Sequence, residues 1–449
     1  MSTTSHILVA EHRAVYRGLP VLMFWVFIVS LLLVATAFGG MQYFVIALAF
    51  GLGVIVWMRP QEAIGAGMLY LFACHVVFPS AARLDTLAES AWEMYYWAVG
   101  LLIITAAAVA RLGLRRVLTV PLSAKVFLAI AFAAAVYGET HGAATSHVLR
   151  QLYGVLLLIV YFGIARQAGN QELLLRRIQT FGVLCAFCFF VYYIAVFETY
   201  GFHKEIGFNG TQAGLLAIVL FITGLERRRY AWLFGGLVLF LVPVLLFFRG
   251  DVLTFVMALP AALALKLRSI KVRLLCFSAI ALVALTATVP PVAQYVGEEL
   301  AKVPVIGEIL PEGLFAADTL TDRTVQLAAA AGTVQAHPLL GAGLGSFLGF
   351  ESSALGYEET GYVDSGWGYI LQKMGFLGLA AFVWFLATAL RGMSREALAL
   401  SACLLAATLV RMFSQPVFLH FTTAPFIGAF AGLLYAKRWN LPAVTIAKQ

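Results

Sequence analysis

The feature that most constrains this chain is a series of about fourteen apolar runs, each long enough to cross a lipid bilayer as a helix. The hydrocarbon core of a bilayer takes about 20 apolar residues to span. Hydrophobic residues make up 62% of the sequence and charged residues 12%, against about 25% charged in a soluble globular protein. So few charges exclude a cytosolic enzyme, a disordered chain and a nucleic-acid-binding protein. We place the runs at roughly 20–37, 41–58, 62–79, 93–110, 121–138, 147–165, 178–197, 208–225, 230–248, 251–266, 272–289, 365–390, 397–412 and 418–436.

The charged residues between these runs predict how the chain is oriented. One set of alternating connections, which includes both ends of the chain, holds 22 of the 30 Lys and Arg residues and 5 of the 22 acids. The other set holds the remaining 8 basic and 17 acidic residues. Because basic connections stay in the cytoplasm, we expect both termini to be cytoplasmic and the acidic connections to lie outside.

One outer connection, at about 290–364, is far longer than the others, and such a loop is usually functional. It divides the chain into transmembrane helices at 1–289, an outer subdomain at 290–364 and further transmembrane helices at 365–449. Asp322 can cap a helix from Arg323 to about Ala336. The helix should stop at His337, because the residue before Pro338 is driven out of the helical region. A glycine-rich turn is expected next, over residues 339–346.

Arginines on the outer side are candidates for binding an anion. Arg249 lies between two runs with almost no loop, and pairing with Asp251 is the alternative. Arg323 would sit in the first turn of its helix, where the helix dipole disfavours a cation. For Arg150 and Arg411 the alternative is contact with lipid headgroups. Several guanidinium groups converging at a membrane suit a diphosphate, such as that of a polyprenyl carrier.

Two residues are candidates for acid–base chemistry. Asp364 closes the long loop, where it could be a general base or only the N-cap of the next helix. His337 could take the proton instead, or merely orient its turn. Nearby aromatic residues could pack on sugar rings or anchor the chain at the membrane interface: Tyr357, Tyr362 and Trp367. No acidic pair of the kind that holds a metal-bound nucleotide sugar is present outside, so we expect neither metal nor cofactor.

At these residues the sequence resembles the superfamily of bacterial O-antigen ligases and Wzy-type oligosaccharide repeat-unit polymerases. One patch is Arg323 followed by His337-Pro-Leu-Leu-Gly-Ala-Gly-Leu-Gly-Ser-Phe347, similar to the family's "HPLLGxGxGxF" turn. The second is Asp364 followed by Gly375-Phe-Leu-Gly378, and the third is the short string Phe248-Arg249-Gly250. Together these patches cover about a quarter of the chain.

The resemblance implies an all-α GT-C-type glycosyltransferase of the bacterial inner membrane, with its active site on the periplasmic face. Arg249, Arg323, Arg150 and Arg411 would hold the diphosphate of an undecaprenyl-linked oligosaccharide, and Asp364 or His337 would activate the acceptor hydroxyl. The reaction would invert the anomeric carbon of the transferred sugar and would need no metal ion. A chain-length regulator and other polysaccharide-assembly proteins are the expected partners, besides membrane lipid.

Two other functions stay open. Ligases of the family carry His-Asn where this chain has Asp364-Ser365, which favours a polymerase over a ligase that transfers glycan to lipid A-core. A lipid-linked oligosaccharide flippase would be expected to show two pseudo-symmetric halves, with charged residues deep in the bundle. In this chain the charged residues that are candidates for function are instead expected on the outer side of the membrane, around the long loop.

Overall fold

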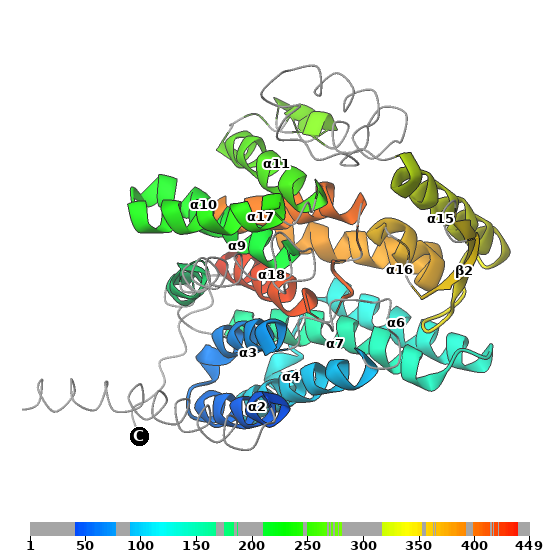
Figure 1. The fold of residues 1–449 in the computed structure, drawn as a ribbon, viewed down its shortest axis with the longest axis horizontal. Helices are drawn as coiled ribbons and strands as arrows, with labels where there is room; N and C mark the ends of the chain where they lie inside the picture. The colour runs from blue at the N-terminus through cyan, green and yellow to red at the C-terminus, as the bar shows by residue number, and fades with distance from the viewer. Residues whose placement is uncertain are drawn as a thin grey trace, which may run out of the picture. The chain divides into compact units, whose positions relative to one another are not determined.

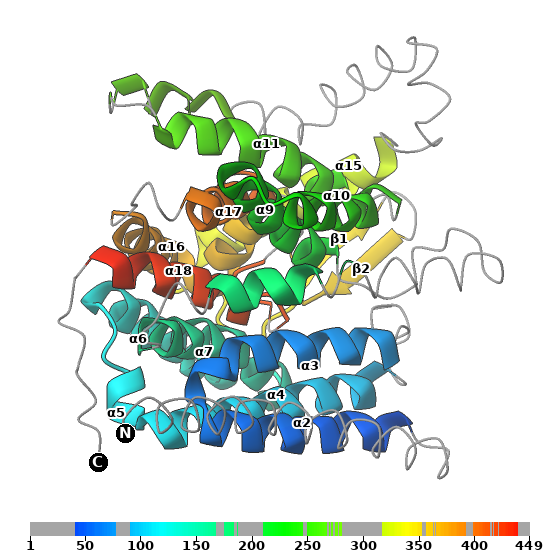
Figure 2. The same ribbon diagram turned by 90° about the vertical axis from the view of Figure 1, so that its left-hand side faces the viewer.

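The computed structural model shows a chain built mostly of helices (Figures 1 and 2). It divides into two compact units, Met1–Arg111 and Leu112–Gln449. The residues that the structure describes are 41–77, 90–167, 175–183, 186, 210–245, 249–266, most of 269–280, 317–352, 356–361, 363, 365–391, 398–413, 415, 417–420 and 422–438.

In its described residues, 41–77 and 90–111, the first unit has three apolar helices and a short 3-10 turn. α2 packs against α3, and the ring of Tyr70 on α3 lies against the backbone of Gly100 on α4. Tyr70, Leu71 and Leu101 are fully buried, so these helices form a core of their own. The elements are α2 (Met41–Met58), η1 (Pro60–Glu62), α3 (Ala63–Val77) and α4 (Ser90–Leu112).

The second unit is a bundle in which helices distant in sequence pack together. Examples are α7 with α18, α6 with α16, and α11 with α17, and the consecutive helices α9 and α10 also pack against each other. Its elements are α5 (Leu114–Val117), α6 (Leu122–Thr140), α7 (Thr145–Gln167), α9 (Gly210–Arg227), α10 (Tyr230–Leu245), α11 (Arg249–Lys266), α15 (Ala317–Ala336), β1 (Leu348–Ser352), β2 (Gly356–Thr360), α16 (Gly366–Leu390), α17 (Leu398–Leu409), η4 (Arg411–Phe413) and α18 (Ala424–Arg438).

An aromatic cluster joins the helices of this bundle. Phe127 of α6 contacts Phe382 and Phe385 of α16, with ring centroids 5.4 and 6.3 Å apart. Phe162 of α7 lies 5.4 Å from Phe385, and Phe418 lies 5.1 Å from Phe382. All five rings are fully buried. Tilted and offset aromatic pairs of this kind contribute beyond the burial of their area, and they fix α6, α7 and α16 against one another.

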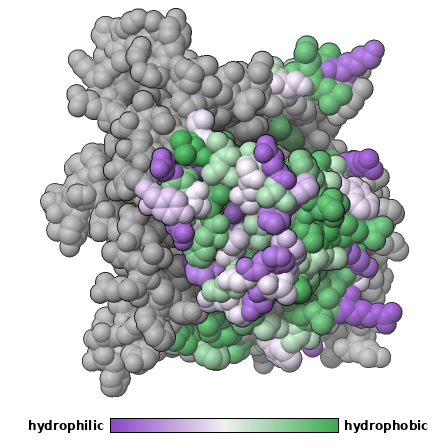
Figure 3. Space-filling view, turned by 90° about the vertical axis from the view of Figure 1, so that its right-hand side faces the viewer, coloured by the Kyte–Doolittle hydropathy of each residue, from purple (hydrophilic) through white to green (hydrophobic). Residues whose placement is uncertain are grey.

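The helices have the character of a membrane-embedded protein. Among the described residues, three helices are long and apolar enough to cross a membrane: Leu122–Thr140, Thr145–Gln167 and Gly366–Leu390. Large apolar side chains are exposed on them, including Phe132, Val136 and Trp384. Figure 3 shows hydrophobic areas beside hydrophilic ones on one face of the molecule. Exposed apolar surface on spanning-length helices indicates burial in lipid.

Most of the predicted apolar runs coincide with helices. The run predicted at 418–436 differs, because residues 417–420 and 422–423 form turns and bends and α18 begins at Ala424. The runs predicted at 20–37 and most of 178–197 lie outside the described residues, as does much of 272–289.

The long loop contains more regular structure than the sequence predicted. α15 ends at Ala336 as expected, but it begins at Ala317, so Asp322 lies inside the helix and the prediction that it is the N-cap is wrong. Arg323 is therefore past the first turn, and the argument from an unfavourable helix dipole does not apply to it. The loop also contains an antiparallel hairpin of β1 and β2, paired from Leu348 with Thr360 to Ser352 with Gly356, which was not predicted.

Candidate functional site

The glycine-rich turn after α15 is inserted between three helices. Leu344 N donates to Ala134 O of α6 at 2.9 Å, and Ala342 N donates to Gln372 O of α16 at 2.7 Å. Gly343 has φ +87°, and a Cβ there would lie 2.5 Å from the Cα of Gly138. Only glycine allows this approach, which explains why the motif needs it at that position.

The same turn fills a kink in α16. Gly375 has φ 61° and ψ −164°, which interrupts the helix. The backbone N–H groups that follow Gly375 donate hydrogen bonds to the turn. Phe376 N donates to Pro338 O at 2.9 Å, and Leu377 N donates to Leu339 O at 3.3 Å. Two of the patches that carry the family resemblance, the proline-glycine turn and the stretch around Gly375, therefore pack directly on each other.

Two polar side chains hold the end of this turn. Gln151 of α7 accepts from Gly345 N at 2.7 Å and donates from Nε2 to Gly361 O at 3.5 Å. Lys373 of α16 donates to the carbonyl oxygen of Ser346 and, at 3.3 Å, to its hydroxyl. Lys373 is fully buried. The sequence had given neither side chain a role, although a lysine inside an apolar run is itself a signal of function.

Two of the four candidate arginines have described side chains. Arg411 is buried in η4, where its guanidinium donates to Thr211 Oγ1 at 3.0 Å and to Gln415 Oε1. The alternative of headgroup contact does not fit this burial. Arg150 is half-buried near the start of α7, within electrostatic reach of His147 and His420.

Hydrogen bonds bring the beginnings of two helices, α9 and α16, to η4 and to the connection between η4 and α18. Thr211 and Gln212 of α9 bond to Arg411 and to Thr422 O, the latter at 2.7 Å. Ser365, before α16, donates to Met412 O at 3.4 Å. The N-termini of α9 and α16, which carry partial positive charge, therefore lie near Arg411 and Met412 of η4.

The other two arginines are placed only through their backbones. Arg249 begins α11, which packs against η4 and α17, and Arg323 lies in the first half of α15. Their side chains lie outside the described residues. Convergence of all four guanidinium groups therefore stays a prediction.

The two candidate bases differ in what the structure describes. His337 is exposed at the start of the turn, and its Nδ1 lies 3.1 Å from the hydroxyl of Tyr137 on α6. Asp364 lies outside the described residues. The N-cap of α16 is Ser365, whose hydroxyl accepts from Gly368 N at 3.2 Å. The interpretation of Asp364 as that cap is thus wrong, and its role as a base stays a prediction.

The aromatic candidates lie in two different settings. Tyr357 is exposed on β2, close to Gly349 of β1, with its hydroxyl 3.4 Å from Glu359 Oε1. Trp367 is half-buried, with its ring edge-on to Phe382 at 6.2 Å. Tyr362 lies outside the described residues. The exposed ring of Tyr357 beside a carboxylate is the one suited to stacking on a sugar.

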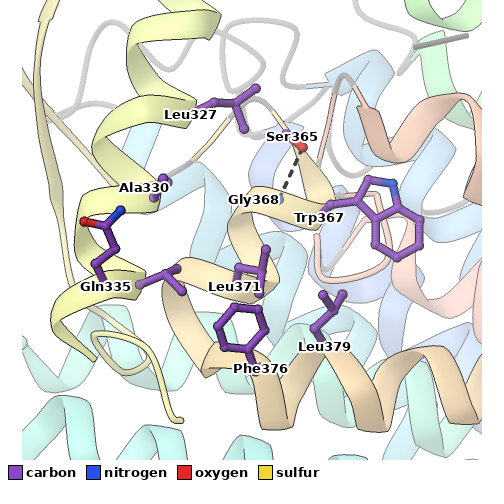
Figure 4. A pocket seen from close by; sticks show the side chains of 11 residues that line it. Leu327, Ala330, Gln335, Ser365, Trp367, Gly368, Leu371, Phe376 and Leu379 are labelled. Atoms are coloured by element: carbon purple, nitrogen blue, oxygen red, sulfur yellow. Dashed lines mark hydrogen bonds between the residues drawn. The ribbon is translucent and has the colours of Figure 1, made fainter. Parts of the chain in front are cut away.

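An apolar cavity of about 680 Å³ lies between α15 and α16 (Figure 4). Gln335 and Ser365 are the polar side chains at its wall. A cavity of this size and lining suits a hydrocarbon chain rather than a sugar. Its apolar lining includes Leu327, Ala330, Val334, Leu371, Phe376 and Leu379.

No protein-family model matches the chain, and no curated protein matches it. Among the described residues, no group of three or more His, Cys, Asp or Glu side chains could hold a metal ion.

Proposed function

We propose that this chain is a GT-C-type glycosyltransferase with about fourteen transmembrane helices that polymerises undecaprenyl-diphosphate-linked oligosaccharides. The observation that carries the proposal is the glycine-rich turn inserted into the kink of α16. It joins two separate sequence patches that resemble the O-antigen ligase and Wzy polymerase superfamily. The resemblance and the positive-inside pattern assign the protein to the bacterial inner membrane, with cytoplasmic termini and a periplasmic site.

Arg411 and the N-termini of α9 and α16 near it support a role in holding a diphosphate. In the proposed reaction the diphosphate leaves as the glycosidic bond forms, so negative charge grows on it and fixed donors stabilise that charge. Arg411 is held rigidly by Thr211 and Gln415, and Arg150 lies near the start of α7. Arg249 and Arg323 would complete the set. Guanidinium forks fit phosphate oxygens without help from metal.

The cavity between α15 and α16 supports a lipid carrier. Residues 327, 330, 331 and 334 of α15 line it, and position 323 precedes Leu327 by one turn on the same helical face. A polyprenyl diphosphate could therefore place its chain along the cavity and its charged head toward Arg323. Asp364 or His337 would accept the proton of the acceptor hydroxyl, and attack from the far side would invert the anomeric carbon.

Two experiments in cells test the proposal. Arg249→Ala and Arg323→Ala should each stop chain extension while the protein stays in the membrane at its normal level. Lysine should rescue poorly, since it lacks the planar fork. Full extension in both alanine variants would overturn the proposed diphosphate site. Glycan that reaches lipid A-core without any lengthening would favour the ligase instead.

A further inference from the structure

The hairpin of β1 and β2 is attached to the bundle at its base. The pairing of Leu348 with Thr360 brings the two ends of the hairpin together. On one side of this base is Gly345, at the end of the turn that begins with His337. On the other side is Gly361, three residues before Asp364. The turn that begins with His337 and the backbone at Gly361, which leads toward Asp364 in the sequence, therefore meet at this point.

The side chain of Gln151 bonds to both ends of the hairpin base. Its Oε1 accepts from Gly345 N at 2.7 Å, and its Nε2 donates to Gly361 O at 3.5 Å, at the long end of the hydrogen-bond range. The two backbone partners are one donor and one acceptor, so the amide fits in a single orientation. Neither a carboxylate nor an aliphatic side chain can make both bonds.

Contacts from two helices reinforce this attachment. Lys373 of α16 donates to the carbonyl and hydroxyl oxygens of Ser346, the next residue along the turn. The ring of His147 on α7 packs edge-on against Phe347 with centroids 4.9 Å apart. Of the three side chains Gln151, Lys373 and His147, Gln151 is the one with a hydrogen bond described here to Gly361, which follows β2.

We propose that Gln151 is a positioning residue that sets the geometry between the turn of His337 and the segment of Asp364. This inference rests on the proposed function, because it assigns those segments to one active site. It makes Gln151 act through the backbone rather than on substrate. Misplacement of a reacting group by about 1 Å can cost about 10²-fold in rate, so loss of the bonds should lower kcat.

Three variants of the purified protein test the role of Gln151. Gln151→Leu removes both hydrogen bonds, and Gln151→Glu at neutral pH keeps the acceptor but loses the donor. When its carboxyl group is protonated, the glutamate variant can again accept from Gly345 and donate to Gly361. Gln167→Leu is the matched control, because Gln167 lies at the opposite end of α7 and bonds to Arg116 O, away from the hairpin.

Polymer formation is measured from lipid-linked repeat units, together with amide hydrogen exchange over residues 343–363. Gln151→Leu should lower kcat by about 10–100-fold with little change in KM for the lipid donor, while exchange at Gly345 rises about tenfold. The activity of Gln151→Glu relative to the unaltered protein should increase from about pH 7.5 to about pH 5. Gln167→Leu should leave both readouts unchanged.

The two readouts separate this inference from the proposed function. Unchanged exchange at Gly345 in Gln151→Leu would overturn the attachment itself. Faster exchange with normal kcat would overturn the positioning role, as would a glutamate variant with no pH-dependent recovery. If the unaltered protein forms no polymer from authentic donor, the proposed function is wrong. The attachment of the hairpin by Gln151 is then still tested by hydrogen exchange at Gly345.

Discussion

Replacing Gly343 by alanine should destabilise the contact between the glycine-rich turn and α6. The left-handed backbone at φ +87° costs an L-residue about 1–2 kcal/mol. The added Cβ would also lie 2.5 Å from the backbone of Gly138 and 3.0 Å from Ala134 O. Those neighbours are main-chain atoms that cannot rotate away, and such overpacking costs a further ~1–3 kcal/mol. The expected loss in free energy of unfolding is about 2–5 kcal/mol.

Gly142 provides the matched control for this prediction. Its φ of +89° is nearly the same, but nothing lies within 4 Å of a Cβ added there. Gly142→Ala should therefore lose only the backbone term of about 1–2 kcal/mol. Thermal unfolding of both variants in detergent measures the difference. Equal losses in the two variants would show that the close packing of Gly343 on α6 contributes nothing, and would refute the reasoning.

Four other predictions concern the site and its surroundings. Arg411→Ala should destabilise the protein by about 2–4 kcal/mol in thermal unfolding, because it removes the hydrogen bonds of a buried guanidinium group to Thr211 and Gln415 and leaves a cavity in its place; an unchanged melting temperature would contradict this. Asp364→Asn should fold normally and lose about 10²–10⁴-fold in polymer formation if the carboxylate is the base; normal polymer, with His337→Gln inactive, would assign the proton to His337. Ala331→Trp, which fills the cavity, should raise KM for long-chain lipid donors but not for short-chain analogues, whereas Ala328→Trp, outside the lining, should change neither; equal effects of both variants would mean the cavity does not hold the chain. A topology reporter fused after Gly349 should read periplasmic, and a cytoplasmic reading would reverse the whole orientation.

The sequence predicted most of the described membrane helices, because hydropathy over a long window is a strong signal. It also predicted the end of α15, since Pro338 acts locally on the residue before it. The start of α15 at Ala317 was missed because Asp322 is a good cap, and nothing local indicates that the helix continues before it. The hairpin was missed because its strands have only five residues each, too few to establish an alternating pattern.

The arrangement of the site depends on contacts between distant segments. The kink at Gly375 leaves the N–H groups of Phe376 and Leu377 to donate to Pro338 O and Leu339 O, more than thirty residues earlier, so no local pattern could reveal it. The burial of Arg411 was likewise unpredictable, because its partner Thr211 belongs to α9. The arginine itself was a candidate from the sequence because charge in an apolar segment is costly, and its role in binding stays a prediction.

Polymerisation by the purified protein is the most direct test of the proposed activity. Lipid-linked repeat units can be extracted from cells that accumulate them when the gene is deleted. Incubated with the protein and a chelator, they should form a ladder of glycans on the lipid, with one undecaprenyl diphosphate released for each new glycosidic bond. A folded protein that releases no lipid diphosphate and lengthens no glycan from its own donor would contradict the account.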